Sequence, residues 1–252
     1  MPHSPWSLRE RQARLDLGSF SAQLDVDQPR LGLGSIASSG EPFAKLALYQ
    51  IGIEPRIDNP VAGGSDVYVR GNDLIATYER TEARPLRFQL FWRALSATQP
   101  ASAAGVELVV SVQTHLLDSD PKLTITSTIP ATDVRRLCAA DGSHFVTVAA
   151  DARTGSSDIS TPPSCILFRI SPTASYVEML HPTDCRQVTI SSLAGSAANM
   201  FSLQTRLFVE RLEKGVILRS RMRSYLLPRA ADEATAAQLY REFAIAEPPL
   251  TA

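Results

Sequence analysis

Cysteine is scarce in this chain of 252 residues, and its three copies lie far apart, at Cys138, Cys165 and Cys185. An odd number with no C-x-x-C pair argues against a disulfide framework and against a structural zinc site. We therefore expect free thiols in a reducing compartment, and we predict a cytoplasmic protein.

Long apolar runs and an excess of charge of either sign are also missing. No segment approaches the roughly 20 apolar residues of a membrane span, and residues 1–11 lack the apolar core of a signal peptide. The formal net charge of -1 gives no general attraction to nucleic acid or to an anionic membrane. We expect neither of these partners, and the oligomeric state stays open.

Motifs for cofactors and metals are absent from the sequence. It contains no G-x-x-x-x-G-K-[ST], no H-E-x-x-H and no G-x-S-x-G pattern. The four histidines include no close pair of the kind that ligates a transition metal. We therefore expect no metal and no cofactor, so that any chemistry would use side chains alone.

The chain does contain a long succession of strand patterns. Apolar and polar residues alternate through residues 86–95, where every second residue from Leu86 to Trp92 would face a core. Similar patterns recur along the chain at intervals of roughly 8–15 residues. The glycines within residues 31–36 suit a strand that bends or that other backbone approaches closely.

One helical pattern appears near the end of the chain. Asp232 can cap residues 233–243, in which apolar side chains recur at positions i, i+3, i+4 and i+7. Many strands and one late helix predict an all-β fold, a large antiparallel two-sheet sandwich with a short C-terminal helix. Since no boundary interrupts the pattern, we predict a single domain over residues 1–252.

The last two strand patterns carry several candidate binding residues. Residues 201–211 and 216–226 both alternate, and a Glu-Lys-Gly turn lies between them, which predicts a hairpin. A tight turn would set Arg206 roughly opposite Arg221. Because like charges in that position destabilise a sheet, we expect this face to meet acids, a ligand or a partner.

Four arginines belong to this predicted face: Arg206, Arg219, Arg221 and Arg223. Guanidinium groups make forked hydrogen bonds to carboxylates, phosphates and vicinal hydroxyl groups. The face is therefore a candidate ligand site. A solvated row of arginines paired with nearby carboxylates is the alternative interpretation.

A second candidate site lies where the strand pattern of residues 176–180 ends. Tyr176 and Glu178 share one strand face, and His181 and Asp184 follow directly. A carboxylate and a histidine that lie close together can exchange protons near neutral pH. We predict Glu178 as base and His181 as acid, with Tyr176 and Asp184 contacting a ligand. A solvated strand end, in which Asp184 caps a turn, is the alternative.

A third candidate site joins Gln113 and His115, which share a face at the end of another strand pattern, to Asp118 in the turn beyond. Polar residues at one end of a β-sandwich often line a site, because loops gather there. His115 is therefore an alternative acid, and Gln113 a candidate ligand contact. An exposed edge with a turn-forming Asp118 is the alternative interpretation.

Three segments resemble the galactose-mutarotase-like family: residues 13–18, the Leu-Gly-Leu-Gly run at residues 31–34, and residues 86–92. The likeness is architectural and covers most of the chain. It implies a "supersandwich" that binds carbohydrate on a concave sheet face. The family's enzymes use a histidine acid and a glutamate base to open and reclose a sugar hemiacetal. Their Tyr-Phe-Asn motif beside the histidine does not occur here, so the resemblance assigns no catalytic residue.

Two functions from different classes follow. The first is a carbohydrate-binding, mutarotase-like domain whose ligand, a sugar or an anionic sugar derivative, would be held by Arg206, Arg221 or Arg223. Any turnover would be metal-free acid–base chemistry at C1 of an aldose, and whether the chain is an enzyme stays open. The second is a non-catalytic sandwich for protein interaction or assembly. A pocket with convergent side chains would favour the first, and a broad patch with apolar anchors the second.

Overall fold

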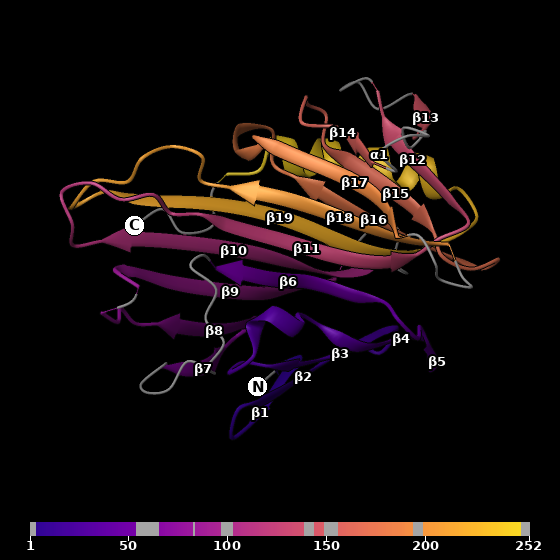
Figure 1. Ribbon diagram of the computed structural model, residues 1–252. Helices are drawn as coiled ribbons and strands as arrows, with labels where there is room; N and C mark the ends of the chain where they lie inside the picture. The colour runs from indigo at the N-terminus through magenta and orange to yellow at the C-terminus, as the bar shows by residue number, and fades with distance from the viewer. Residues whose placement is uncertain are drawn as a thin grey trace.

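The computed structural model describes residues 4–53, 66–82, 84–96, 103–138, 144–148, 156–193 and 199–247. Within these residues the chain forms three antiparallel β-sheets and one α-helix (Figure 1). We call the sheets the large sheet, the opposing sheet and the N-terminal sheet.

The large sheet has nine strands in the order β13-β12-β15-β16-β19-β10-β9-β8-β7. Their bounds are β7 (Val67–Arg70), β8 (Asp73–Tyr78), β9 (Leu86–Ser96), β10 (Ala104–Thr114), β12 (Asp133–Leu137), β13 (Phe145–Thr147), β15 (Cys165–Arg169), β16 (Ala174–Leu180) and β19 (Ile217–Pro228). The last strand in the sequence, β19, thus lies inside the sheet, between β10 and β16.

The opposing sheet has five strands in the order β14-β17-β18-β11-β6, and the N-terminal sheet joins β1 to β5 in sequence order. The bounds in the opposing sheet are β6 (Ala47–Ile53), β11 (Leu123–Pro130), β14 (Ser156–Asp158), β17 (Gln187–Leu193) and β18 (Met200–Leu207). Those in the N-terminal sheet are β1 (Trp6–Arg9), β2 (Gln12–Asp16), β3 (Phe20–Asp25), β4 (Gly34–Ser38) and β5 (Glu41–Pro42). Two short 3-10 helices, η1 (Pro29–Leu31) and η2 (Pro182–Asp184), complete the described elements.

The main core lies between the sheets and is built by residues that alternate along the strands. On β9, the side chains from Leu86 to Trp92 enter this core at every second position, as the sequence predicts. Val106 and Leu108 of β10 enter it as well. The intervening residues of β9 and β10 therefore lie on the outer face of the large sheet.

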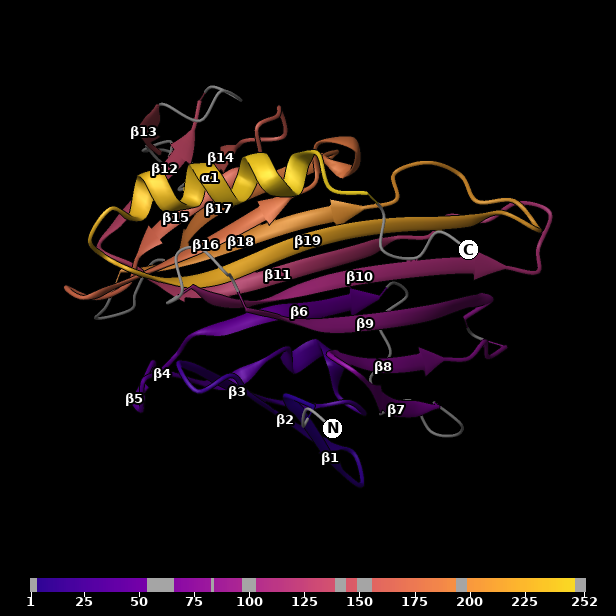
Figure 2. The same ribbon diagram turned by 180° about the vertical axis from the view of Figure 1, so that it is seen from behind.

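The helix α1 (Asp232–Ala244) covers part of this outer face. Figure 2 shows it lying across β15, β16 and β19. Its buried residues, among them Leu239 and Phe243, form a second core with side chains of those strands. The predicted C-terminal helix is confirmed, so β16 is covered on both of its faces.

The helix does not begin as its sequence predicts. Ala231 is the N-cap, in a left-handed conformation, and its side chain makes no capping hydrogen bond. Asp232 is instead the first helical residue, and its carboxylate accepts hydrogen bonds from Arg169 and from the Ser175 hydroxyl at 3.2 and 2.7 Å. Asp232 is therefore not the N-cap residue, although its Oδ1 accepts the backbone N–H of Glu233 at 2.8 Å, and its carboxylate also meets polar partners from β15 and β16.

The predicted hairpin of residues 201–211 and 216–226 was also wrong. Strand β18 pairs with β11 and β17, whereas β19 pairs with β10 and β16, so the two strands belong to different sheets. Arg206 lies opposite Thr124 and Gln187, and is exposed. The connection between the strands buries Phe208 and Leu212 in the main core, and this burial carries the chain from one sheet to the other.

The predicted all-β antiparallel sandwich is confirmed, and its strands divide among three sheets rather than two. Among the helices that the structure describes, none has the length and apolar character needed to cross a membrane.

Candidate functional site

Glu178 and Tyr176 point from β16 into the main core. The Glu178 carboxylate, 2% exposed, accepts hydrogen bonds at Oε2 from the Tyr176 hydroxyl at 2.5 Å and from Ser127 of β11 at 2.6 Å. Burial raises the pKa of Glu178 to about 7, although the Ser127 and Tyr176 hydrogen bonds oppose the shift. The carboxyl thus connects the large sheet to the opposing sheet from within.

His181 lies on the other face of the large sheet. It follows the end of β16, and its backbone N–H donates to the carbonyl oxygen of Arg221 at 3.3 Å. Its ring packs edge-on against Phe243 of α1, with 5.3 Å between the ring centroids. Burial, and then the nearby Arg221 charge, lower the pKa of His181, so the neutral imidazole is favoured. The fold therefore does not bring His181 and Glu178 together.

The third predicted constellation lies at the end of β10. His115 is exposed in the turn beyond the strand, and Gln113 is half-buried on the outer face of the large sheet. Asp118 accepts a hydrogen bond from Arg211 Nε at 2.7 Å. None of these three residues contacts His181 or Asp184 through a hydrogen bond or an ion pair between described residues.

A line of hydrogen bonds connects His181 to Asp184 through η2. The His181 Nδ1 lies 2.8 Å from the Thr183 hydroxyl, which donates to Asp184 Oδ1 at 3.0 Å. The other oxygen, Asp184 Oδ2, accepts the backbone N–H of Arg221 at 2.8 Å. The predicted residues His181, Asp184 and Arg221 thus form one connected group where β16 ends beside β19.

The side chains of Arg221 and Arg223 bind other parts of the protein. Arg221 donates to the carbonyl oxygen of Glu247 at 2.8 Å and to that of Ala246. Arg223 Nε donates to Glu107 Oε1 at 2.9 Å. Both guanidinium groups lie over the Phe243 ring, at 5.4 Å for Arg221 and 4.5 Å for Arg223. The two arginines therefore hold the helix and the segment after it against the large sheet.

Arg223 ends a row of charged residues that we call the charge ladder: Asp73, Arg93, Glu107 and Arg223. These residues are directly opposite one another on β8, β9, β10 and β19. Arg93 makes two bonds to Asp73, at 2.7 and 2.9 Å, and its Nη1 lies 3.7 Å from Glu107 Oε2. Sequence reasoning missed Glu107, although it is the one charged residue in an otherwise apolar run, residues 104–110.

A cavity of about 240 Å³ lies beside Asp184, and we call it the Asp184 pocket. Its lining residues are Asp184, Arg186, Phe208, Glu210, Leu218, Arg219 and Ser220. The Ser220 hydroxyl, in a residue 5% exposed, has no hydrogen-bond partner among the described residues. Phe208 adopts a φ of 56°, which is rare for a bulky residue and typical of functional sites.

The charges in the Asp184 pocket are balanced. Arg186 Nε donates to Glu210 Oε1 at 2.7 Å, and this bond lowers the pKa of Glu210 below its ordinary value. Two carboxylates therefore face two guanidinium groups, from Arg186 and Arg219. Of the predicted residues, Asp184 and Arg219 line the pocket, while His181 and Arg221 adjoin it through the hydrogen bonds described above.

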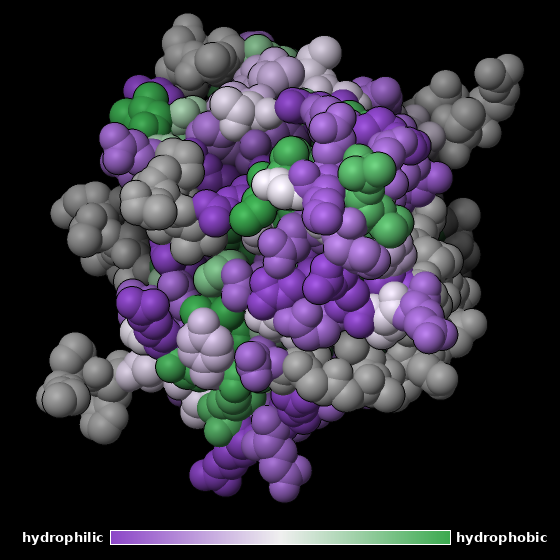
Figure 3. All heavy atoms as spheres, turned by 90° about the vertical axis from the view of Figure 1, so that its left-hand side faces the viewer, coloured by the Kyte–Doolittle hydropathy of each residue, from purple (hydrophilic) through white to green (hydrophobic). Residues whose placement is uncertain are grey.

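The surface around the pocket is largely hydrophilic. Figure 3 looks onto the end of the sandwich where β18 ends and β19 begins, and its hydrophobic residues form separate spots in the part that the structure describes. The exposed apolar residues of this end include Leu117 and Ile217, with 83% and 51% of their surface accessible. Separate spots suit a protein interface less well than one continuous apolar area would.

None of the described residues forms a group of three or more histidine, cysteine, aspartate or glutamate side chains that could hold a metal ion.

The sandwich is similar to several solved structures over most of its length. A candidate aldose 1-epimerase from Escherichia coli K12 aligns with a TM-score of 0.59 and 10% identity, over 85% of this chain and 98% of that one. A candidate mutarotase from Salmonella typhimurium aligns with a TM-score of 0.52 and 11% identity, over 89% and 93% of the two chains. A GalM/aldose epimerase homologue from C. elegans gives 0.50 and 8%, over 84% and 97%.

The chain has the galactose-mutarotase-like architecture. At such low identity the likeness concerns the fold alone, because one fold hosts many functions. No protein-family model and no curated protein sequence matches the chain.

Proposed function

We propose that the chain binds a carbohydrate in the Asp184 pocket. One observation carries the proposal: the pocket gathers carboxylates, guanidinium groups and the unpartnered Ser220 hydroxyl around the apolar side chains of Phe208 and Leu218. Ligand sites combine apolar walls with a few convergent polar groups in this way. The mutarotase-like architecture, which the chain shares with aldose epimerase structures, supports a sugar as the ligand.

The chemistry of the lining suits a sugar ring. Sugar hydroxyl groups donate and accept, so they can bond both the Asp184 and Glu210 carboxylates and the Arg219 guanidinium. The C–H faces of the ring can pack on Phe208. The cavity of about 240 Å³ is small beside ligand clefts, which begin at about 300 Å³. We therefore expect a monosaccharide rather than a longer chain.

A neutral sugar fits better than an anionic one. The charges of the lining balance, and two of the arginines that the sequence offers for an anion, Arg221 and Arg223, already bind protein groups. Arg221 holds two carbonyl oxygens and Arg223 holds Glu107, while Arg206 lies in the opposing sheet. None of these three arginines is among the described residues that line the pocket, so a sugar phosphate or sugar acid would not meet their charges there.

The positions of Glu178 and His181 favour a protein that binds a sugar over an enzyme that converts one. Opening a hemiacetal needs an acid and a base on one sugar, and the Glu178 carboxyl and the His181 ring lie on opposite faces of the large sheet. The hydrogen bonds from His181 to Asp184 instead hold the pocket carboxylate in place.

The test is a titration of the whole chain with D-glucose and D-galactose, and with their 6-phosphates. We expect a neutral sugar to raise the melting temperature in a concentration-dependent way. Ser220→Ala should weaken this binding about two- to tenfold, the effect of one hydrogen bond. Ser224→Ala is the matched control, because Ser224 is buried on the same face of β19 and does not line the pocket.

Two results would contradict the proposal. One is an unchanged melting temperature with neutral sugars at millimolar concentration, which would favour the alternative function of a protein-interaction module. The other is binding that Ser220→Ala and Asp184→Asn leave unchanged, which would place the sugar elsewhere on the chain.

A further inference from the structure

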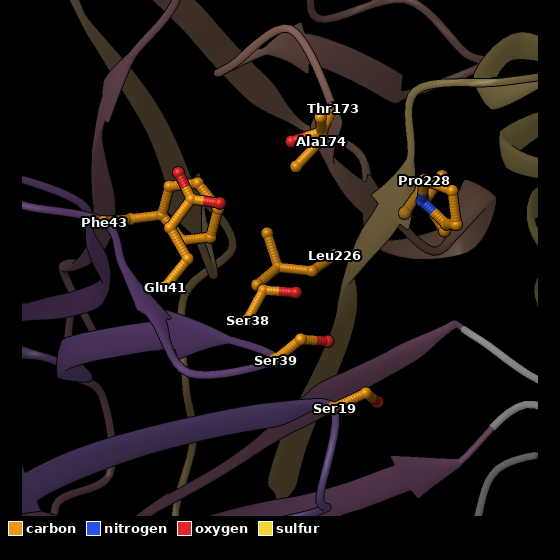
Figure 4. A pocket seen from close by; sticks show the side chains of 10 residues that line it. Ser19, Ser38, Ser39, Glu41, Phe43, Thr173, Ala174, Leu226 and Pro228 are labelled. Carbon is orange, nitrogen blue, oxygen red and sulfur yellow. The ribbon is translucent and has the colours of Figure 1, made fainter.

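A second cavity lies at the other end of β19, where the N-terminal sheet meets the large sheet (Figure 4). Its volume is about 280 Å³. Turns and strand ends supply its polar lining, which consists of Ser19, Ser38, Ser39, Glu41 and Thr173. We call it the hydroxyl pocket. It shares no residue with the Asp184 pocket.

The serine hydroxyl groups of this pocket are available to a ligand. Those of Ser19, Ser38 and Ser39 make no hydrogen bond to another described residue. The backbone places them, since the Ser39 N–H donates to the Ser19 carbonyl oxygen at 3.0 Å. Figure 4 shows the Thr173 side chain facing them from the turn between β15 and β16.

Ser39 is held in an unfavourable backbone conformation. It precedes Gly40 in the turn between β4 and β5, and the two residues have φ values of 48° and 85°. Two successive positive φ values favour Asn-Gly, and a left-handed residue with a Cβ costs about 1–2 kcal/mol. A serine at this position adds strain to the turn and places a hydroxyl at the pocket wall.

Glu41 and Phe43 give the pocket a preference for positive charge. They are alternate residues of an extended segment, so their side chains point to the same side. Glu41 makes no ion pair with any described residue, and the described residues that line the pocket include no lysine, arginine or histidine. A carboxylate beside an aromatic ring is a combination that attracts an ammonium group.

We propose that the hydroxyl pocket binds an amino sugar, a ligand with several hydroxyl groups and one ammonium group. The serine and threonine hydroxyl groups would bond the sugar hydroxyl groups, while Glu41 and Phe43 would hold the ammonium. The volume suits one sugar ring, since it lies near the lower limit of about 300 Å³ for ligand clefts. The site is separate from the carbohydrate site proposed above.

The test is an NMR titration of the whole chain with D-glucosamine and with N-acetyl-D-glucosamine, slightly below neutral pH. The two sugars differ in charge because acetylation removes the ammonium. We expect D-glucosamine to shift the amide signals of Ser39, Glu41 and Ala174. It should bind about two- to fivefold more tightly than the acetylated sugar, as one exposed ion pair allows. Glu41→Gln should remove this difference.

A pair of glycine substitutions separates binding from stability. Ser39→Gly should weaken D-glucosamine binding without lowering the melting temperature, because glycine adopts the positive φ freely. Ser35→Gly is the matched control: Ser35 is exposed on β4 with a φ of 50°, and it lies outside the pocket lining. Its effect on stability should be similar, and its effect on binding absent.

Two outcomes would overturn the inference: no shift at the hydroxyl pocket with D-glucosamine, or equal binding of the charged and acetylated sugars there. Signals of Asp184 and Ser220 report the other pocket in the same spectra. A neutral sugar that shifts only those signals would leave the first proposal standing while removing this one.

Discussion

Glu178 carries a carboxyl group in the main core, where its partners among the described residues are two hydroxyl groups and no cation. A carboxylate is costly to bury without a countercharge, so the protonated form is favoured. The hydroxyl groups of Ser127 and Tyr176 partly offset this cost by bonding Oε2. The result is a group whose ionisation opposes folding.

We expect the free energy of unfolding to fall as pH rises from about 4.5 to about 7. The folded pKa of Glu178 is raised from its ordinary value of 4.5 to about 7, so the folded state keeps a proton that the unfolded state releases. The stabilisation of the folded state by this retained proton is fully present below pH 4.5 and is lost by pH 7. It amounts to about 3 kcal/mol.

Denaturant unfolding of the wild type and of Glu178→Gln over this pH range measures the effect. Glutamine keeps an oxygen that can accept both hydrogen bonds and does not titrate. The difference between the two stabilities should therefore change by about 3 kcal/mol in favour of the variant as pH rises. Parallel curves would show that Glu178 is ionised in the folded state throughout.

The sequence predicts which residues share a strand face, but not always which face is the core. Tyr176 and Glu178 do share a face, as their spacing indicates. Yet β16 is buried at nearly every position, because the opposing sheet covers one face and α1 the other. Without alternation between apolar and polar residues, no pattern in this strand shows which of its faces meets the opposing sheet and which meets α1.

At the scale of whole elements, the charge ladder connects four neighbouring strands of the large sheet. Glu107 is its most buried member, with a side chain 1% exposed, and it bonds Arg223 at 2.9 Å. Removing one partner of a buried pair leaves the other charge without compensation, which costs more than the pair itself contributes.

We expect Arg223→Met to lower the free energy of unfolding by about 3 kcal/mol, because Arg93, at 3.7 Å, would then be the one remaining ion-pair partner of Glu107 among the described residues. The double variant Glu107→Met with Arg223→Met should recover most of the loss, since both charges are removed. Chemical denaturation of the two single variants and the double variant measures this coupling.

Arg87→Met is the control for the ladder. It removes an ion pair of 2.7 Å with Glu79, which directly follows β8 of the same sheet. Both side chains are partly exposed, with 32% and 45% of their surface accessible. We expect it to cost less than about 1 kcal/mol. Equal losses for Arg87→Met and Arg223→Met would mean that burial does not strengthen the ladder.

For the whole molecule, the sequence predicts the layers better than the pairing of strands. Alternation identifies the core faces of β9 and β10, and the resemblance predicts the mutarotase-like architecture that the comparisons support. The hairpin prediction failed because alternation in residues 201–211 and 216–226 is equally satisfied by strands of two different sheets. Pairing depends on long-range burial of Phe208 and Leu212, which no local pattern contains.

Gly32 lies where the N-terminal sheet approaches β6 of the opposing sheet. Gly32 has a φ of 67°, and a Cβ there would lie 2.2 Å from the Leu48 carbonyl oxygen. This confirms the predicted close approach of backbone, beside the bridge between Leu33 and Leu48. We expect Gly32→Ala to lower the free energy of unfolding by more than about 2 kcal/mol, through both clash and positive φ.

Gly34→Ala is the comparison, because nothing lies within 4 Å of its added Cβ. It should change the melting temperature little, whereas Gly32→Ala should lower it by several degrees. Similar melting temperatures for the two variants would mean that the approach to β6 can relax without cost.

The central place of β19 has a consequence for how the chain is made. On the ribosome, β10 and β16 emerge long before residues 217–228, which must later fill the gap between them. Until then each strand presents an unpaired edge to other nascent chains. The large sheet can therefore close only after nearly all of these 252 residues have been synthesised, and chaperones that shield strand edges should matter most in that interval.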